Sequence, residues 1–134
     1  MPRKKKTLIP PNEILREFKS YYPEVDLSQV IWTWEVPFKI YEAEFVHEGK
    51  EYEAEFTVTG HWLLTEEEIK LSDVPEHIIE TAKARYAKAK LEEASKITYS
   101  NGDVCYELGF TAKDKTFEVL YREDGLFIGR GREL

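Results

Sequence analysis

The chain of 134 residues carries an internal repeat, and this repeat limits the folds that it can adopt. The segment Lys50–Phe56 is echoed about 65 residues later by Lys115–Tyr121, with the same alternation of polar and apolar side chains. Gly60 and Gly125 follow the two segments at matching positions. A regular period of this kind indicates copies of one supersecondary unit. Because a unit this small buries little core by itself, we expect the two copies to share one sheet.

In the first copy, apolar spacing and turn residues predict one helix followed by four strands. The helix is expected from Pro11 to Tyr22, because proline suits the first helical turn and apolar residues then recur at helical spacing. Pro23 ends it, and Glu48-Gly49 marks a tight hairpin between the second and third strands. The expected strands are Val30–Val36, Lys39–His47, Glu51–Val58 and His61–Leu64.

The second copy is expected to repeat this order. Ser72 and Asp73 are plausible capping residues ahead of a longer helix, Pro75–Ala94. Trp32–Trp34 is aligned with Ile97–Tyr99 at the start of the second set of strands. These strands are predicted at Lys96–Tyr99, Val104–Thr111, Thr116–Arg122 and Leu126–Gly129.

Alternation along the expected strands assigns side chains to two faces of the sheet. One face receives the aromatic and aliphatic side chains, from Trp32 and Trp34 to Tyr121 and Phe127, and we expect it to pack against both helices. The opposite face receives the glutamates and is expected to be open and acidic. Its polar side chains are Glu42, Glu44, Glu51, Glu53, Glu55, Thr57, Glu107, Glu118 and Arg122.

Several phrases of the sequence closely resemble the PepSY-like family, which is described as similar to β-lactamase inhibitor protein in fold. They are Tyr41–Phe45, Gly49–Phe56, Gly60–Leu63, and Ser72–Pro75 followed by a helix. The resemblance implies an α+β fold in which two tandem α-β4 units form one curved eight-stranded antiparallel sheet, with two helices on one face. We therefore expect a basic flexible tail over residues 1–10, a first unit over 11–70 and a second over 71–134, in one compact domain.

The resemblance also implies export to the periplasm or cell surface and no established enzymatic activity. The basic start Met1–Lys6 is not followed by an apolar segment of signal-peptide length, so a cytoplasmic location is the alternative. A net charge of −7 argues against nucleic acid as a partner. No apolar stretch predicts membrane insertion, and neither the partner's identity nor the oligomeric state is indicated.

We consider three interpretations of the glutamates. Strand pairing across Glu48-Gly49 would bring Glu42 and Glu44 near Glu53 and Glu55, since neighbouring strands lie roughly 4.8 Å apart. The face is then a hydrated polar surface, a docking surface for a Lys/Arg-rich partner, or a hard-cation site such as one for Ca²⁺. Apolar residues among the acids are candidate anchors. The candidate partner-binding residues are Glu42, Glu44, Glu53, Glu55, Glu107, Glu118, Arg122, Phe38 and Ile40.

No residue pattern indicates an enzyme. His47, His61 and His77 each lack a second ligand at metal-site spacing. Cys105 is the single cysteine and has no nucleophile motif around it. Gly129–Arg132 follows a strand without opening a helix, which argues against a phosphate loop. We therefore expect no catalytic residue, no metal-ligating set and no cofactor.

The leading hypothesis is a non-enzymatic binding module that docks a protein or peptide on its open acidic face, which favours a basic partner. The alternative is a cell-envelope protein that binds a cation or a small ligand.

Overall fold

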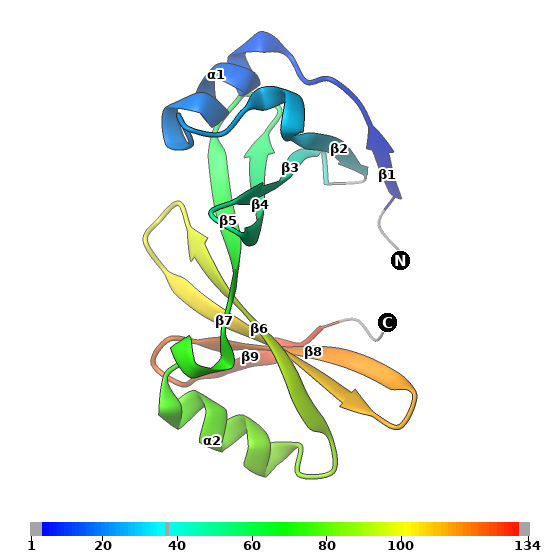
Figure 1. Ribbon diagram of the computed structural model, residues 1–134, viewed down its shortest axis with the longest axis vertical. Helices are drawn as coiled ribbons and strands as arrows, with labels where there is room; N and C mark the ends of the chain where they lie inside the picture. Colours follow the sequence, from blue (N-terminus) through cyan, green and yellow to red (C-terminus); the bar gives the residue numbers. More distant parts are fainter. Residues whose placement is uncertain (1–3, 37, 132–134) are drawn as a thin grey trace. The chain divides into compact units, whose positions relative to one another are not determined.

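The computed structural model describes residues 4–36 and 38–131 (Figure 1). The chain divides into two compact units, residues 1–66 and 67–134. The first unit holds a short strand and a helix, a single 3₁₀ turn and then the meander. Its elements are β1 (Lys4–Thr7), α1 (Asn12–Tyr21), η1 (Leu27–Gln29), β2 (Ile31–Val36), β3 (Ile40–His47), β4 (Lys50–Thr57) and β5 (Trp62–Ile69), the last of which runs into the second unit.

The second unit repeats the helix and the meander. Its elements are η2 (Leu71–Asp73), α2 (Glu76–Arg85), β6 (Lys90–Tyr99), β7 (Val104–Ala112), β8 (Lys115–Arg122) and β9 (Phe127–Arg130). In Figure 1 the chain passes from β3 to β4 and from β7 to β8 through short turns. The strands follow one another in sheet order from β1 to β9. The expected fold class is confirmed: an antiparallel sheet built by two units, each with one helix.

In the first unit, α1 covers the strands with one apolar stripe. Ile14 and Phe18 of this helix are fully buried. The ring of Phe18 meets Trp32 and Phe45 edge to face, with centroids 5.4 Å and 5.1 Å away. Such pairs add to the free energy gained by burying the rings. The core of this unit consists of Ile14, Phe18, Val25, Trp32, Ala43, Phe45, Ala54 and Phe56.

The second unit fills an equivalent core with its bulk in different places. Ala82 of α2 is fully buried, at the position that Phe18 takes in α1. The strands compensate for the small helical residue, because the positions of Ala43 and Ala54 are taken 65 residues later by Leu108 and Val119. All of these residues are fully buried. The exchange moves side-chain bulk from the helix to the sheet, as close packing of an interior requires.

The helices begin in the same way. The carbonyl of Pro11 accepts hydrogen bonds from the amides of Ile14 and Leu15, and the carbonyl of Pro75 accepts from Ile78 and Ile79. Proline fits here because no helical partner is needed for its missing N–H. Neither helix has a side-chain cap, so the expected capping of α2 by Ser72 and Asp73 is wrong.

The prediction of a long second helix is also wrong. α2 ends at Arg85, and the segment expected to continue it becomes β6. Ala, Lys and Glu favour a helix locally. Pairing with β7 overrides this preference, because it buries Leu91 and Ala94 against the core of the second unit. A bulge between Leu91 and Glu93 shifts the alternation of side chains by one residue. Leu91 and Ala94 can therefore both face inward.

The expected flexible tail over residues 1–10 contains a strand instead. The backbone of β1 pairs with β2, with Lys5 opposite Glu35 and Thr7 opposite Thr33. The amide of Leu8 extends this ladder by donating to the carbonyl of Trp32, 3.1 Å away. The unpaired edge of β2 favours this pairing, since an exposed edge offers a row of free N–H and C=O groups. β2 therefore has a neighbour on both sides.

The repeat holds at an offset of 65 residues in the last strands but not in the first. Trp32 lies opposite Ala43, whose counterpart Leu108 lies opposite Ala94. Trp32 therefore corresponds to Ala94, and the predicted alignment of Trp32–Trp34 with Ile97–Tyr99 is wrong by three residues. The segment between the helix and the strand that follows it is shorter in the second unit than in the first. Local similarity of the two sequences hides this difference.

The exchange of core volume predicts a partial rescue. Phe18→Ala should lower the free energy of unfolding by about 3–5 kcal/mol, because it leaves a large cavity. Ala54→Val alone should also destabilise, by about 1–3 kcal/mol, through overpacking. In the Phe18→Ala background the same valine should stabilise, because it fills space that the ring has left. Urea unfolding of the four proteins measures this coupling, and strictly additive effects would contradict it.

Candidate functional site

The glutamates of the first unit form a ladder across β3 and β4. Glu42 lies directly opposite Glu55, and Glu44 lies directly opposite Glu53. The turn between the strands has positive φ angles at Glu48 (53°) and Gly49 (78°), as a two-residue hairpin requires. This turn sets the register, so the pairing expected from the sequence is observed.

These glutamates belong to the side of the strands turned away from α1, which we call the far face. The alternation of β2, β3 and β4 defines it, because one set of side chains packs with α1 and the other points away. Its residues on β2, β3 and β4 are Ile31, Thr33, Glu35, Ile40, Glu42, Glu44, Val46, Glu51, Glu53, Glu55 and Thr57.

The far face is not uniformly open, which corrects the expectation for Glu42. Glu42 is 1% exposed, Glu35 is fully buried and Thr33 is 8% exposed. β3, which carries Glu42, is an inner strand between β2 and β4. The pairing of β1 makes β2 an inner strand as well. Alternation gives the side of the sheet on which a residue lies, but it does not give the cover that its neighbours provide.

Two groups of carboxylates meet on this face. One consists of Glu35, Glu42 and Glu55, and the other of Glu42, Glu44 and Glu53. In each group, one carboxylate oxygen from every residue lies within 4.8 Å of the others. We call the first group the buried triad, since two of its three members are fully or almost fully buried. Glu35 is not among the residues expected from the sequence. Like Thr33, it alternates with Trp32 and Trp34 along the strand, and this alternation indicates the far face.

Apolar side chains border the glutamates. Ile31 lies opposite Glu44 and is 56% exposed, and Val46 is 65% exposed two residues along β3. Among the anchors expected from the sequence, Phe38 is 55% exposed and Ile40 is half-buried opposite Glu35. Ile31 is not among the anchors expected from the sequence, because it lies within a run of apolar residues.

The candidate residues of the second unit do not form a comparable group. Glu107 lies opposite Leu120, and Glu118 lies opposite Gly109. The carboxylates that face each other in the first unit are thus replaced, on one side of each pair, by leucine or glycine. Among the described residues, no group of three metal-ligating side chains occurs in the second unit.

Arg122 is engaged by a neighbour in its own unit. Its Nε donates to Oδ1 of Asp124 over 3.0 Å, and its Nη2 donates to Oδ2 of the same carboxylate. The amide of Leu126 donates to Oδ1 as well, over 3.1 Å. The guanidinium and then this amide hold the pKa of Asp124 at about 2, below its ordinary value of 3.8. This arrangement closes the turn before β9 and occupies the guanidinium.

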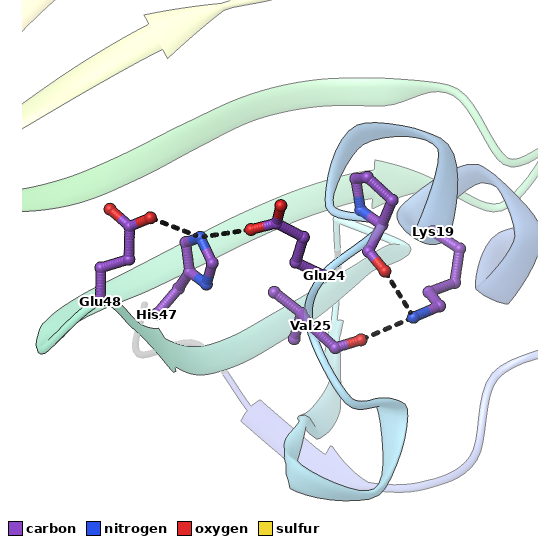
Figure 2. Close-up of polar contacts among 6 residues, drawn as sticks. Lys19, Glu24, Val25, His47 and Glu48 are labelled. Atoms are coloured by element: carbon purple, nitrogen blue, oxygen red, sulfur yellow. Dashed lines mark hydrogen bonds and ion pairs between the residues drawn. The ribbon is translucent and has the colours of Figure 1, made fainter.

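A third group of ligand atoms lies at the other end of the β3–β4 hairpin. Figure 2 shows the His47 ring between the carboxylates of Glu24 and Glu48, with Nε2 3.9 Å and 3.6 Å from them. Lys19 holds the loop that carries Glu24 by donating to the carbonyls of its neighbours Pro23 and Val25, 3.0 Å and 2.8 Å away. Both carboxylates point into solvent, so these contacts contribute little. No sequence spacing indicates this group, because Glu24 is distant from His47 along the chain.

Cys105 is buried on β7, at 7% exposure. Burial, and then the charge of Asp103, raise the pKa of its thiol above the ordinary value of 9.0. A thiol is a poor nucleophile in this state, because the thiolate is the reactive form.

None of the helices in the described part of the chain combines the length and apolar character needed to span a bilayer.

A family model described as "Putative beta-lactamase-inhibitor-like, PepSY-like" matches residues 39–129 of the chain. None of the curated proteins compared with the chain matches it.

Several solved structures share the fold. A DUF2874 family protein from Bacteroides ovatus has a TM-score of 0.79 at 18% identity, covering 94% of this chain and 89% of its own. A protein from Bacteroides eggerthii described as "putative periplasmic" has a TM-score of 0.81 at 15% identity, with coverages of 94% and 90%. A BLIP-like protein from Bacteroides fragilis has a TM-score of 0.72 at 19% identity, with coverages of 95% and 88%. At these identities the likeness carries the fold alone.

The state of Asp124 leads to a testable expectation. In the native protein its carboxyl should titrate with a pKa of about 2, and Arg122→Gln should move this pKa upward toward 3.8. Because the folded pKa lies below the unfolded one, the pair stabilises the fold above about pH 4 and loses this effect as the pH falls toward 2. Carbon-detected NMR titration measures the pKa. Arg130→Gln serves as the control and should leave it unchanged, whereas a native pKa near 3.8 would contradict the assignment.

The burial of Cys105 predicts slow modification. At pH 8 a thiol reagent such as 5,5′-dithiobis(2-nitrobenzoate) should label the native protein at least about 100-fold more slowly than the protein unfolded in guanidinium chloride, since reaction requires an opening of the structure. Absorbance of the released thiolate follows the reaction. Equal rates in the two states would show that the thiol is accessible in the native fold.

Proposed function

Because the chain belongs to the family of PepSY-like, β-lactamase-inhibitor-like proteins, we propose that it is a non-enzymatic binding module. Its ligand in this proposal is a basic segment of a protein or peptide, and the docking surface is the exposed part of the far face in the first unit. The single observation that carries the proposal is the Glu44–Glu53 pair, which lies half-buried on one face with exposed Ile31 beside it.

The chemistry of this surface favours a ligand of mixed character. Carboxylates side by side on neighbouring strands repel one another, so a Lys or Arg side chain placed between them is attracted to both. Apolar side chains within an acidic surface can contact apolar groups of a partner. A surface that is only hydrated does not need them. An extended segment with alternating basic and apolar residues matches both features, since its side chains repeat with the spacing of a strand.

The copy-to-copy difference also supports this assignment. Glu44 and Glu55 of the first unit are replaced by Gly109 and Leu120 in the second. The fold therefore forms without these carboxylates, and they are available for a role that only the first unit has.

We place this module outside the cytoplasm, in the periplasm or at the cell surface. The support is the description of the structurally similar Bacteroides eggerthii protein as "putative periplasmic". The likeness to a BLIP-like protein does not by itself carry inhibition of a β-lactamase, because function resides in sites and not in folds.

The docking proposal is tested with a labelled ten-residue peptide of alternating Lys and Leu, measured by fluorescence anisotropy. The doubly substituted protein Glu44→Gln/Glu53→Gln should bind it about tenfold more weakly, equivalent to about 1.4 kcal/mol. Binding by the unchanged protein should also weaken between about 50 mM and 500 mM salt, since exposed charges are screened.

The matched control is Glu107→Gln/Glu118→Gln, which removes the same charge from the second unit and should leave binding unchanged. A peptide with Glu in place of Lys should not bind. Equal affinities of the two doubly substituted proteins for the Lys-Leu peptide would contradict the proposal.

A further inference from the structure

The outer edge of β2 is covered by a segment that is itself basic and extended. β1 contains three lysines in its four residues, Lys4–Thr7. It lies at the end of the strand order and pairs only with β2 (Figure 1). Lysine is depleted in strands, so the residues of β1 give it little tendency to form one alone. The row of N–H and C=O groups along the edge of β2 therefore drives this pairing.

The hydrogen-bond pattern shows which backbone groups of β2 face β1. The amide of Leu8 donates to the carbonyl of Trp32, 3.1 Å away, so these two residues continue the ladder as a hydrogen-bonded pair. Hydrogen-bonded and non-hydrogen-bonded pairs alternate along an antiparallel ladder. Lys6 and Trp34 therefore form the next hydrogen-bonded pair.

The pair of Lys5 and Glu35 is then of the non-hydrogen-bonded kind, with backbone groups that point away from this ladder. The carbonyl of Glu35 agrees with this assignment, because it accepts from the amide of Lys39, 2.9 Å away, ahead of β3. Pairing with β2 thus needs the amide of Lys6 and does not need the amide of Lys5.

The far-face residues along this edge favour a particular order of side chains in a strand beside β2. Lys5 lies opposite Glu35. If the register continued beyond Leu8, Ile9 would lie opposite Ile31, and both isoleucines are exposed, at 88% and 56%. A basic residue followed four positions later by an aliphatic one matches this row, because alternate residues of a strand share a face.

The segment that joins β1 to α1 makes β1 an arm. Pro10 is buried and anchors the chain, while Ile9 before it is exposed. A short tether keeps the arm near its own edge at an effective concentration in the millimolar range. A segment from another molecule that binds this edge must therefore displace β1.

We propose that the edge of β2 is a docking site for an extended basic segment of a partner protein, which enters as a strand in place of β1. The far face beside this edge carries the glutamates of β2, β3 and β4, so a basic segment is attracted to it. In such strand addition the main chain gives affinity and alternate side chains give specificity. The inference rests on the proposed function for the basic character of the ligand, and it adds the way in which the ligand is held.

The test uses proline substitutions in the full chain, because proline removes one backbone donor. Lys6→Pro removes an amide that faces β2 and should free the edge. Lys5→Pro is the matched control, since it removes the same charge and an amide that points away from β2. The described core of the first unit begins at Ile14, so both proteins should fold, and thermal melting checks this.

The probe is a labelled peptide, Lys-Lys-Lys-Thr-Leu-Ile, which has the sequence of residues 4–9. In fluorescence anisotropy, Lys6→Pro should bind it at least about tenfold more tightly than the unchanged chain, because β1 no longer competes. Lys5→Pro should stay within about threefold of the unchanged chain. A peptide with proline in place of Lys6 should not bind, whereas one with proline in place of Lys5 should. Equal affinities of the two substituted proteins would overturn the proposal.

A disulfide that closes β1 tests the exchange in the native chain. Thr7 and Thr33 are opposite in a non-hydrogen-bonded pair, whose Cα atoms lie about 4.5 Å apart, within the range of about 4.4–6.8 Å that disulfides span. Thr7→Cys/Thr33→Cys should bind the peptide like the unchanged chain when reduced, and should not bind it when oxidised. The same result in both states, including no binding in either, would contradict the exchange.

The Glu44→Gln/Glu53→Gln protein separates this inference from the proposed function. If that protein binds the peptide weakly while Lys6→Pro and Lys5→Pro bind it alike, the far face holds the ligand and the edge proposal is wrong. If Lys6→Pro gains affinity while the glutamine substitutions have no effect, the edge alone holds the ligand and the docking face is wrong. A dimer in which two copies exchange β1, seen by light scattering, would overturn the choice of partner.

Discussion

The register between β3 and β4 is the constraint on which the first unit depends. Ala43 opposite Ala54 and Glu42 opposite Glu55 are two consequences of the same alignment. A slip of one residue would turn the alanines outward and bring the carboxylates against α1, because side chains alternate between the faces. Glu48 and Gly49, whose backbones have positive φ angles, form the hairpin turn that fixes this alignment. Core packing and the acidic cluster therefore have one common cause.

Within this register the two units place the bulk of their cores on different elements. Phe18 with two alanines in the first unit is balanced by Ala82 with a leucine and a valine in the second. A position-by-position comparison of the copies obscures this relation, since each exchange alone would leave a cavity or a clash. It becomes clear only when the helix and the strands are considered together.

The sequence predicts those features that local chemistry determines. Alternation identifies the strands and the faces, and Glu48-Gly49 identifies the hairpin that pairs Glu42 with Glu55. Residues 86–95 could not be predicted in this way, because their helical preference is overridden by pairing with a strand that lies later in the chain. The repeat is visible in the later strands of each unit, because the offset between the two copies is constant there.

The acidic face was predicted as a set of residues but not in its depth. Glu42 was expected in solvent and Glu35 was not among the predicted residues, because the pairing of β1 with β2 and the depth of burial on a sheet face are not visible in local sequence. Arg122 was grouped with the glutamates, yet a carboxylate two residues away holds it. What distinguishes the first unit is therefore a half-buried cluster of acids. In the second unit, Glu107 and Glu118 keep two of the carboxylates, and the positions of Glu35, Glu44 and Glu55 hold apolar residues or glycine.

The central claim is that the two units share a fold and that only the first has a docking face for a basic segment. Backbone amide NMR spectra recorded during a titration with the Lys-Leu peptide test it most directly, because each position has a counterpart in the same molecule. The account predicts saturable shifts at Ile31, Glu44 and Glu53, and unchanged signals at their counterparts Glu93, Gly109 and Glu118. Equal shifts in both sets, or no shift in the first, would contradict it.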